Sequence, residues 1–263
     1  MKTYLDFAST TPMATEVIEE MHAVMSEASF GNPSSLDHEY GIKAKNIIEE
    51  SRNEVASLIN AKPEEIVWTS GATESNNLAI IGFHQFQYKN QALRFVTSHL
   101  EHKSVIESLQ SVEALGSNVS YIQPNKDGQI DLETFVSQLD PNTTFVSCMH
   151  INNETGAVND IANIGKYCRK NEIIFHVDAA QSVGKIPIDV NDMCIDLMSM
   201  SAHKVYGPKG VGALYINKDS VGRVKSLIVG GGQERGMRSG TLPTHQIAGM
   251  GIAYRISKQK MTQ

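Results

Sequence analysis

Residues 199–210 read SMSAHKVYGPKG and follow an apolar run that begins at Ile195. Such a run predicts a buried strand, and the Gly-Pro pair after it predicts a turn. The pattern therefore places Lys204 at the tip of a strand, beside Ser201 and His203. A lysine held in a cleft, where burial and neighbouring cations lower its pKa, is the usual amine of Schiff-base chemistry. A solvated lysine on a polar surface turn is the simpler alternative.

Strand and helix patterns alternate along the chain around this stretch. Besides the run that leads to Lys204, short apolar runs predict strands at residues 65–70, 94–97, 119–122, 144–149, 173–177 and 211–216. Amphipathic segments separate most of them, two helices are expected before the first strand, and another is expected after Pro243. This order predicts an α/β fold with a mostly parallel sheet and helices on both faces. Ligands of such sheets bind beyond the carboxyl ends of the strands.

Polar clusters follow several of the predicted strands. After Ser70, residues 71–73 open a helix that we expect to end near Gly82, and the free amides of a helix N-terminus bind anions. A plain capped helix explains this turn equally well. Asp178 follows another strand, either as a cap or as a partner for a ligand. Residues 229–241 form a glycine-rich loop whose two arginines and Ser/Thr pair again suit an anion.

Composition and charge exclude several classes of protein. The chain has 263 residues, 41% of them hydrophobic and 20% charged, which fits one large or two small soluble domains. A net charge of -6 argues against nucleic acid or an anionic membrane as a partner. No apolar run approaches the ~18 residues of a membrane span, and the N-terminus lacks the apolar stretch of a signal peptide.

The cysteine and histidine spacings indicate neither disulfides nor a metal. Cys148, Cys168 and Cys194 are odd in number and widely separated, so we expect a reduced, cytoplasmic protein. The HLEH sequence at residues 99–102 does not have the HExxH spacing and no third ligand is evident, so no metal site is expected.

Five stretches taken together resemble the cysteine desulfurases of the bacterial iron–sulfur cluster assembly type. They are TSGATES at 69–75, EHK at 101–103, VDAAQS at 177–182, SAHK at 201–204 and RGMRSGT at 235–241. The resemblance covers essentially the whole chain and implies the aspartate-aminotransferase-like fold of pyridoxal 5'-phosphate (PLP) enzymes. The activity it implies is conversion of L-cysteine into L-alanine, with the sulfur kept on the enzyme for iron–sulfur clusters.

The resemblance also assigns roles around the cofactor. By it, Lys204 binds PLP as a Schiff base and shuttles the α proton, and Asp178 pairs with the pyridinium nitrogen, so the ring acts as an electron sink. His102 stacks on the ring face and is a candidate for moving protons. Gln181 and Asn153 reach the phenolic oxygen, and Asn153 also lies near the substrate.

The phosphate contacts complete this expected site. The resemblance gives them to Ala72, Thr73, Ser201 and His203, and to Thr241 supplied by a second subunit. A homodimer is therefore implied. An iron–sulfur scaffold or another sulfur-acceptor protein is the further partner expected of such an enzyme.

The resemblance breaks off at the C-terminus, because family members continue into a small domain. Residues 1–263 are expected to form only the PLP-binding large domain. The loop with the sulfur-accepting cysteine, and an arginine that grips the substrate carboxylate, belong to the small domain, so full turnover by this chain alone is not expected. Two alternatives stay open: another PLP reaction on this fold, such as aminotransfer or selenocysteine lysis, or a non-catalytic remnant that binds PLP or dimerises.

Overall fold

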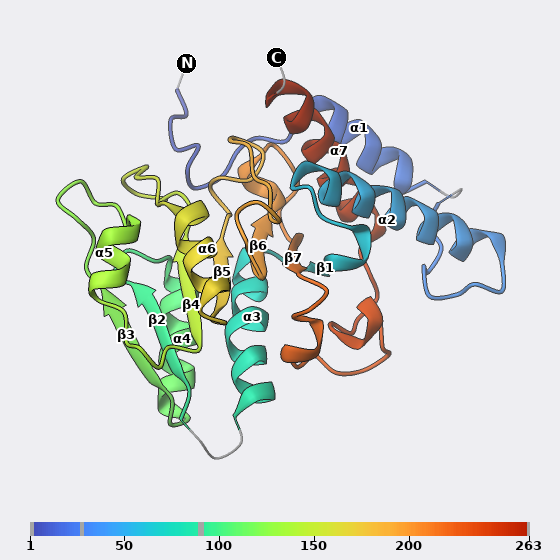
Figure 1. Cartoon of the computed structure of the whole chain (residues 1–263). Coiled ribbons are helices and arrows are strands. Elements are labelled where there is room, and N and C mark those ends of the chain that lie inside the picture. Colours follow the sequence, from blue (N-terminus) through green and yellow to red (C-terminus); the bar gives the residue numbers. More distant parts are fainter. Residues whose placement is uncertain (1–2, 27–28, 89–91, 262–263) are drawn as a thin grey trace.

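The computed structural model describes residues 3–26, 29–88 and 92–261. Within these ranges one sheet has the strand order β1-β7-β6-β5-β4-β2-β3 (Figure 1). Strands β2 to β6 run parallel, and β7 is antiparallel to both β1 and β6. The prediction of a mostly parallel sheet is confirmed. The strands are β1 (Ile66–Thr69), β2 (Arg94–Ser98), β3 (Asn118–Ile122), β4 (Phe145–Met149), β5 (Ile174–Asp178), β6 (Leu197–Ser201) and β7 (Gly212–Ile216).

Helices cover both faces of this sheet. Side chains of α3 and α4 form one core with every second strand residue, such as Phe145, while α2, α6 and α7 form the other core with the intervening residues, such as Val146. In Figure 1, α1, α2 and α7 lie together at one side. No helix within the described ranges is long and apolar enough to cross a bilayer. The α-helices are α1 (Thr15–Val24), α2 (Glu39–Leu58), α3 (Ala72–Gln87), α4 (Lys103–Ala114), α5 (Leu132–Ser137), α6 (Ile161–Lys170) and α7 (Thr244–Met261).

Burial on both faces explains why the central strands read as nearly continuous apolar runs. All five residues of β4 are buried, as are all five of β5, β6 and β7. Full burial of a large apolar side chain contributes about 1.5–3 kcal/mol, so these strands anchor the fold. The polar continuations of the parallel strands β4, β5 and β6 then emerge together at one edge of the sheet, where the antiparallel β7 begins.

Helix α3 is longer than the sequence predicts. We expected it to end near Gly82, but it continues to Gln87. A Cβ at Gly82 would lie 2.6 Å from the carbonyl oxygen of Lys225 and 2.8 Å from the Val224 side chain. Gly82 therefore allows close approach of a neighbouring segment, and it does not end the helix.

Strand β6 ends sooner than expected. It stops at Ser201, and Ala202–Lys204 form a 3-10 turn, so Lys204 lies three residues beyond the strand tip. The strand that follows, β7, pairs antiparallel with β6.

The insertion of β7 brings together two segments that are distant in sequence. Gly212 pairs with Thr69 of β1 on one side and with Ser201 of β6 on the other. A Cβ at Gly212 would lie 2.4 Å from the Met200 carbonyl oxygen and 2.6 Å from the Gly71 Cα atom. The loop after β1 and the turn that carries Lys204 thus share one edge of the sheet because a glycine starts the strand between them.

Candidate active site

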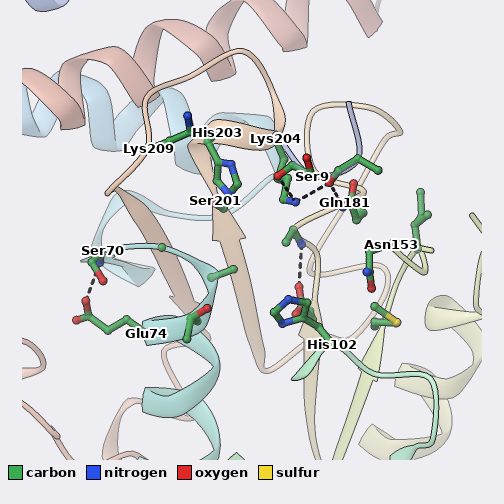
Figure 2. A pocket seen from close by; sticks show the side chains of 18 of the residues that line it. Ser9, Ser70, Glu74, His102, Asn153, Gln181, Ser201, His203, Lys204 and Lys209 are labelled. Atoms are coloured by element: carbon green, nitrogen blue, oxygen red, sulfur yellow. Dashed lines mark hydrogen bonds between the residues drawn. The ribbon is translucent and has the colours of Figure 1, made fainter. Parts of the chain in front are cut away.

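A cavity of about 590 Å³ opens beyond the carboxyl ends of β1, β4, β5 and β6 (Figure 2). Its size lies within the range of about 300–1,000 Å³ that is usual for small-molecule sites. Among the residues that the sequence predicted for the site, Thr241 does not line the cavity and is exposed on this chain. The predicted residues that line the cavity are Ala72, Thr73, His102, Asn153, Asp178, Gln181, Ser201, His203 and Lys204.

Lys204 is half-buried and tethered. Its Nζ donates to the carbonyl oxygens of Ala8, at 2.6 Å, and Ser9, at 2.8 Å. Burial lowers the pKa of the Lys204 ammonium from its ordinary value, although the carboxylates of Asp178, Asp6 and Glu154 oppose part of that effect. A lysine held in this way is suited to act as a nucleophile, because a lowered pKa raises its neutral fraction.

The N-terminal segment forms a wall of the cavity that the sequence analysis missed. Thr11 donates from both its amide and its hydroxyl to the carbonyl oxygen of His203, each at 2.9 Å. His203 Nδ1 lies 3.1 Å from Thr10 Oγ1. Residues 9–12 read STTP, a local pattern of a turn and helix start, and nothing in it indicates contacts to a residue more than 190 positions away.

Asp178 is buried, and both of its carboxylate oxygens are fixed. Oδ2 accepts from Asn76 Nδ2 at 2.9 Å, and Oδ1 accepts from the Ala180 amide at 3.0 Å. Each carboxylate oxygen has two lone pairs, so Asp178 keeps capacity for a donor within the cavity. Asn76 was not among the predicted site residues. An asparagine on the buried face of a helix is nevertheless a signal, because a buried amide needs a polar partner.

The N-terminus of α3 provides free amides at another side of the cavity. Its N-cap residue, Gly71, has a φ of 152° and no side chain to satisfy the first amides of the helix. Ser201, His203 and Lys209 also line the cavity. Burial, followed by the charges of Lys204 and Lys209, lowers the pKa of His203. These donors suit an anionic group.

Gln181 and Asn153 lie on the side of the cavity away from Ser70 in Figure 2. Gln181 Nε2 donates to the Ala8 carbonyl oxygen at 2.7 Å, and its Oε1 accepts from Lys185 Nζ at 3.0 Å. Asn153 Nδ2 donates to Glu154 Oε1 at 2.7 Å. The side-chain amides of Gln181 and Asn153 both lie at the cavity wall, where each is hydrogen-bonded to another group of the protein.

The two arginines of the glycine-rich loop do not line this cavity in their own chain, so their suitability for an anion stays a prediction. Arg238 Nε donates to Glu74 Oε1 at 2.7 Å, and Arg235 Nη2 donates to the Ile66 carbonyl oxygen at 2.7 Å. Burial opposes ionisation of Glu74, but hydrogen bonds from Arg238 and Ser70 hold its pKa below the ordinary value. Both guanidinium groups therefore fasten the loop to β1 and α3.

Comparison with known proteins agrees with this geometry. Residues 3–263 match the sequence profile described as aminotransferase class-V. The chain belongs to the aminotransferase class-V family. Among curated relatives, it is 51% identical over 98% of its length to the protein named cysteine desulfurase IscS of Pseudomonas entomophila. It spans 64% of the length of that relative.

Solved structures of other proteins are similar to this class-V chain over nearly all of its length. The one titled "SspA in complex with cysteine" has a TM-score of 0.90 and 42% identity, covering 96% of this chain and 72% of that one. A NifS-like protein has a TM-score of 0.94 and 36% identity, covering 100% and 71% of the two chains. The resemblance and the fold class predicted from the motifs are confirmed.

The buried carboxyl group of Glu101 lies next to the candidate active site. Glu101 Oε1 accepts from the Met149 amide at 2.8 Å, which joins the segment before α4 to the end of β4. Burial raises the pKa of Glu101 well above its ordinary value, and the charge of Asp178 adds to this rise, although the Met149 hydrogen bond opposes it. From the sequence, Glu101 was considered only as a metal ligand. Within the described residues, no group of three or more His, Cys, Asp or Glu side chains could hold a metal.

Proposed function

We propose that residues 1–263 are the PLP-binding large domain of a cysteine desulfurase, which converts L-cysteine into L-alanine and transfers the sulfur to the enzyme. The observation that best supports this proposal is that three groups meet in one cavity. They are the tethered amine of Lys204, the buried carboxylate of Asp178 and the uncapped amides at the start of α3. The relatives named cysteine desulfurase, and the related structure solved with cysteine, support the choice of substrate.

The donor set fits PLP. An amine suits its aldehyde, a carboxylate suits its ring nitrogen, and helix amides with Ser201 and His203 suit its phosphate. Bound there, PLP would supply an electron sink for the carbanion formed at the substrate α carbon. Gly71 supports this fit, because no atom lies within 4 Å of where its Cβ would be, so the loop leaves room for a ligand.

The protein's own groups then have separate tasks. The Lys204 amine binds the cofactor and moves the α proton at Nζ, and the Asp178 carboxylate keeps a proton on the ring nitrogen. His102, which lines the cavity, would lie against the ring of the bound cofactor. Gln181 and Asn153 orient the ring oxygen, which requires Gln181 to exchange one of its present hydrogen bonds.

The phosphate cup would be completed in a homodimer. Ala72, Thr73, Ser201 and His203 supply its contacts from one chain, and Thr241 of a second copy adds another. Thr241 is exposed and outside the cavity of its own chain, which leaves it available for such a contact. An iron–sulfur scaffold or another sulfur acceptor is the proposed downstream partner.

Cofactor titration tests this proposal. Adding PLP to the purified chain should produce the absorption band of a protein-bound Schiff base, and borohydride reduction followed by peptide mapping should place the label on Lys204. Lys204→Ala should abolish the band. Lys209→Ala should retain the band at saturating PLP, because Lys209 lines the cavity as a donor to the anionic group and lies beyond the turn that carries Lys204. A label on Lys209 with Lys204 unmodified, or no band with the parent chain, would refute the assignment.

A further inference from the structure

A row of hydrogen bonds joins Asp178 to His102 through Asn76 and Ser104. Asn76 is fully buried and Ser104 is nearly so. Asn76 Nδ2 lies 2.9 Å from Asp178 Oδ2 and 2.8 Å from Ser104 Oγ. Ser104 Oγ in turn lies 2.8 Å from His102 Nδ1. The row therefore connects the carboxylate at the end of β5 with the imidazole just before α4.

The direction of each hydrogen in this row follows from the groups involved. An ionised carboxylate only accepts, so Asn76 must present its NH₂ group to Asp178 and not its oxygen. The second hydrogen of that NH₂ points to Ser104 Oγ. Because Ser104 Oγ accepts from Asn76, its own hydrogen is free to be donated to His102 Nδ1.

A second donor reaches the same nitrogen. The backbone amide of Ser104 donates to His102 Nδ1 at 3.1 Å, which caps α4. A ring nitrogen that accepts hydrogen bonds carries a lone pair, so neutral His102 must have its proton on Nε2. Protonation of Nδ1 would remove the lone pair that accepts from the Ser104 amide, and it would require Ser104 Oγ to accept from Nδ1 and to turn its own hydrogen away.

The opposite nitrogen of His102 is free. Within the described residues, Nε2 has no hydrogen-bond partner, and His102 is an exposed residue that lines the cavity (Figure 2). The Nε2–H group is therefore available to a ligand as a donor, while the buried side of the ring is fully engaged.

We propose that Asn76 and Ser104 are positioning residues that hold His102 in its neutral Nε2–H tautomer, so that it presents a hydrogen-bond donor to the cavity and not a base. The inference rests on the proposed function only for the identity of the ligand that His102 faces. A ligand group that pairs with the His102 Nε2–H donor must be an acceptor, such as a sulfur or oxygen lone pair. Abstraction of the substrate proton then falls to the Lys204 amine.

The tautomer can be read directly by nuclear magnetic resonance with ¹⁵N-labelled histidine, in the chain without and with PLP. Long-range correlations between ring protons and nitrogens separate the two neutral tautomers and the imidazolium, and the His102 signals are assigned by their loss in His102→Asn. At neutral pH we expect His102 as the Nε2–H tautomer. Ser104→Ala should shift the Nδ1 resonance, because only the backbone amide of residue 104 still donates to that nitrogen, and Ser104→Thr should keep the parent pattern.

Ser108→Ala is the matched control. Ser108 lies one turn further along α4, is also buried, and donates to the Ser104 carbonyl oxygen without contacting His102. It should leave the His102 signals unchanged. The spectrum of the parent chain tests the inference even where a variant fails to fold, because an Nδ1–H tautomer or an imidazolium at His102 would overturn the inference. An unchanged His102 signal in folded Ser104→Ala would also overturn it. A failed PLP titration would instead overturn the proposed function, because the tautomer is measured without cofactor.

Discussion

Asp178 is held on both oxygens by groups of its own chain, Asn76 and the Ala180 amide. Asp178→Asn keeps an acceptor oxygen but loses the charge that would keep a ring nitrogen protonated. We expect PLP to bind still, since the phosphate contacts are unchanged. Exchange of the substrate α proton should slow by about 10²–10³-fold, the scale observed when one group that stabilises developing charge is removed.

Deuterium exchange at the α carbon of cysteine or alanine, followed by mass spectrometry, measures this change. Asp127→Asn is the control, because Asp127 is exposed and remote from the cavity. Equal exchange rates in Asp178→Asn and the parent chain would show that Asp178 does not serve the ring nitrogen.

A buried ion pair connects α2 with the glycine-rich loop. Arg52 Nη1 and Nη2 donate to the two carboxylate oxygens of Glu234, each at 2.8 Å, and both side chains are nearly inaccessible. Glu234 Oε2 also accepts from the Trp68 amide of β1. Glu234→Ala would leave the buried Arg52 guanidinium with the half-exposed Glu49 as its remaining ionic partner, and should lower the free energy of unfolding by about 3 kcal/mol, the lower end of the range for breaking a buried pair.

Urea denaturation measures that loss. Arg94→Met, which breaks the more exposed Arg94–Asp140 pair, should cost at most about 1 kcal/mol. If the two variants lost similar amounts of unfolding free energy, burial would not be the reason that the Arg52–Glu234 pair stabilises the fold.

Three strands are joined by a buried histidine. His176 Nδ1 lies 2.8 Å from Ser147 Oγ and its Nε2 lies 2.9 Å from Ser199 Oγ, so β4, β5 and β6 are connected by one ring. Burial lowers the pKa of His176 to about 3. Since unfolded histidine has a pKa near 6.5, the unfolded state binds the extra proton, and the contribution of His176 to stability is full above about pH 6.5 and is lost as the pH falls toward 3.

Between pH 7 and pH 5 this linkage should remove about 2 kcal/mol from the free energy of unfolding. His176→Gln cannot titrate, so its stability should fall less over that range by the same amount. Denaturant melts of both proteins at the two pH values test this. Glu101, whose linkage has the opposite sign, is present in both, so its effect cancels. Equal pH dependence in the two proteins would mean that His176 is not held neutral.

At the scale of the whole molecule, none of the three cysteines is placed for sulfur transfer. Cys148 and Cys168 are buried, Cys194 is partly buried, and none lines the cavity. Burial raises the pKa of both Cys148 and Cys168, so neither forms a thiolate readily. The purified 263-residue chain loaded with PLP should therefore not release alanine and sulfide continuously from L-cysteine.

Alanine and sulfide assays over many equivalents of cysteine measure this outcome. Continuous turnover that survives Cys194→Ser would contradict the expectation and show that this chain desulfurates cysteine without any cysteine at the site. Turnover that disappears in Cys194→Ser would contradict the placement of Cys194 as a structural residue.

The sequence by itself determined the strand order along the chain, the class of fold and most side chains of the candidate site. These features are local: buried strands read as apolar runs, and the residues just beyond them carry the site, as Asp178 does after β5. Local patterns missed two boundaries: α3 continues past Gly82, where the distant Lys225 approaches closely, and β6 ends before Lys204.

Only the tertiary structure decided which groups meet. The insertion of β7 between β1 and β6 brings Gly71 and Ser201 to one edge, and the Ala8 carbonyl reaches Lys204 across 196 positions of chain. Asn76 likewise acquires its place between Asp178 and Ser104 only when α3, α4 and β5 pack together. Such contacts depend on strand order and layer packing, because a hydrogen bond between distant residues leaves no periodic pattern near either of them.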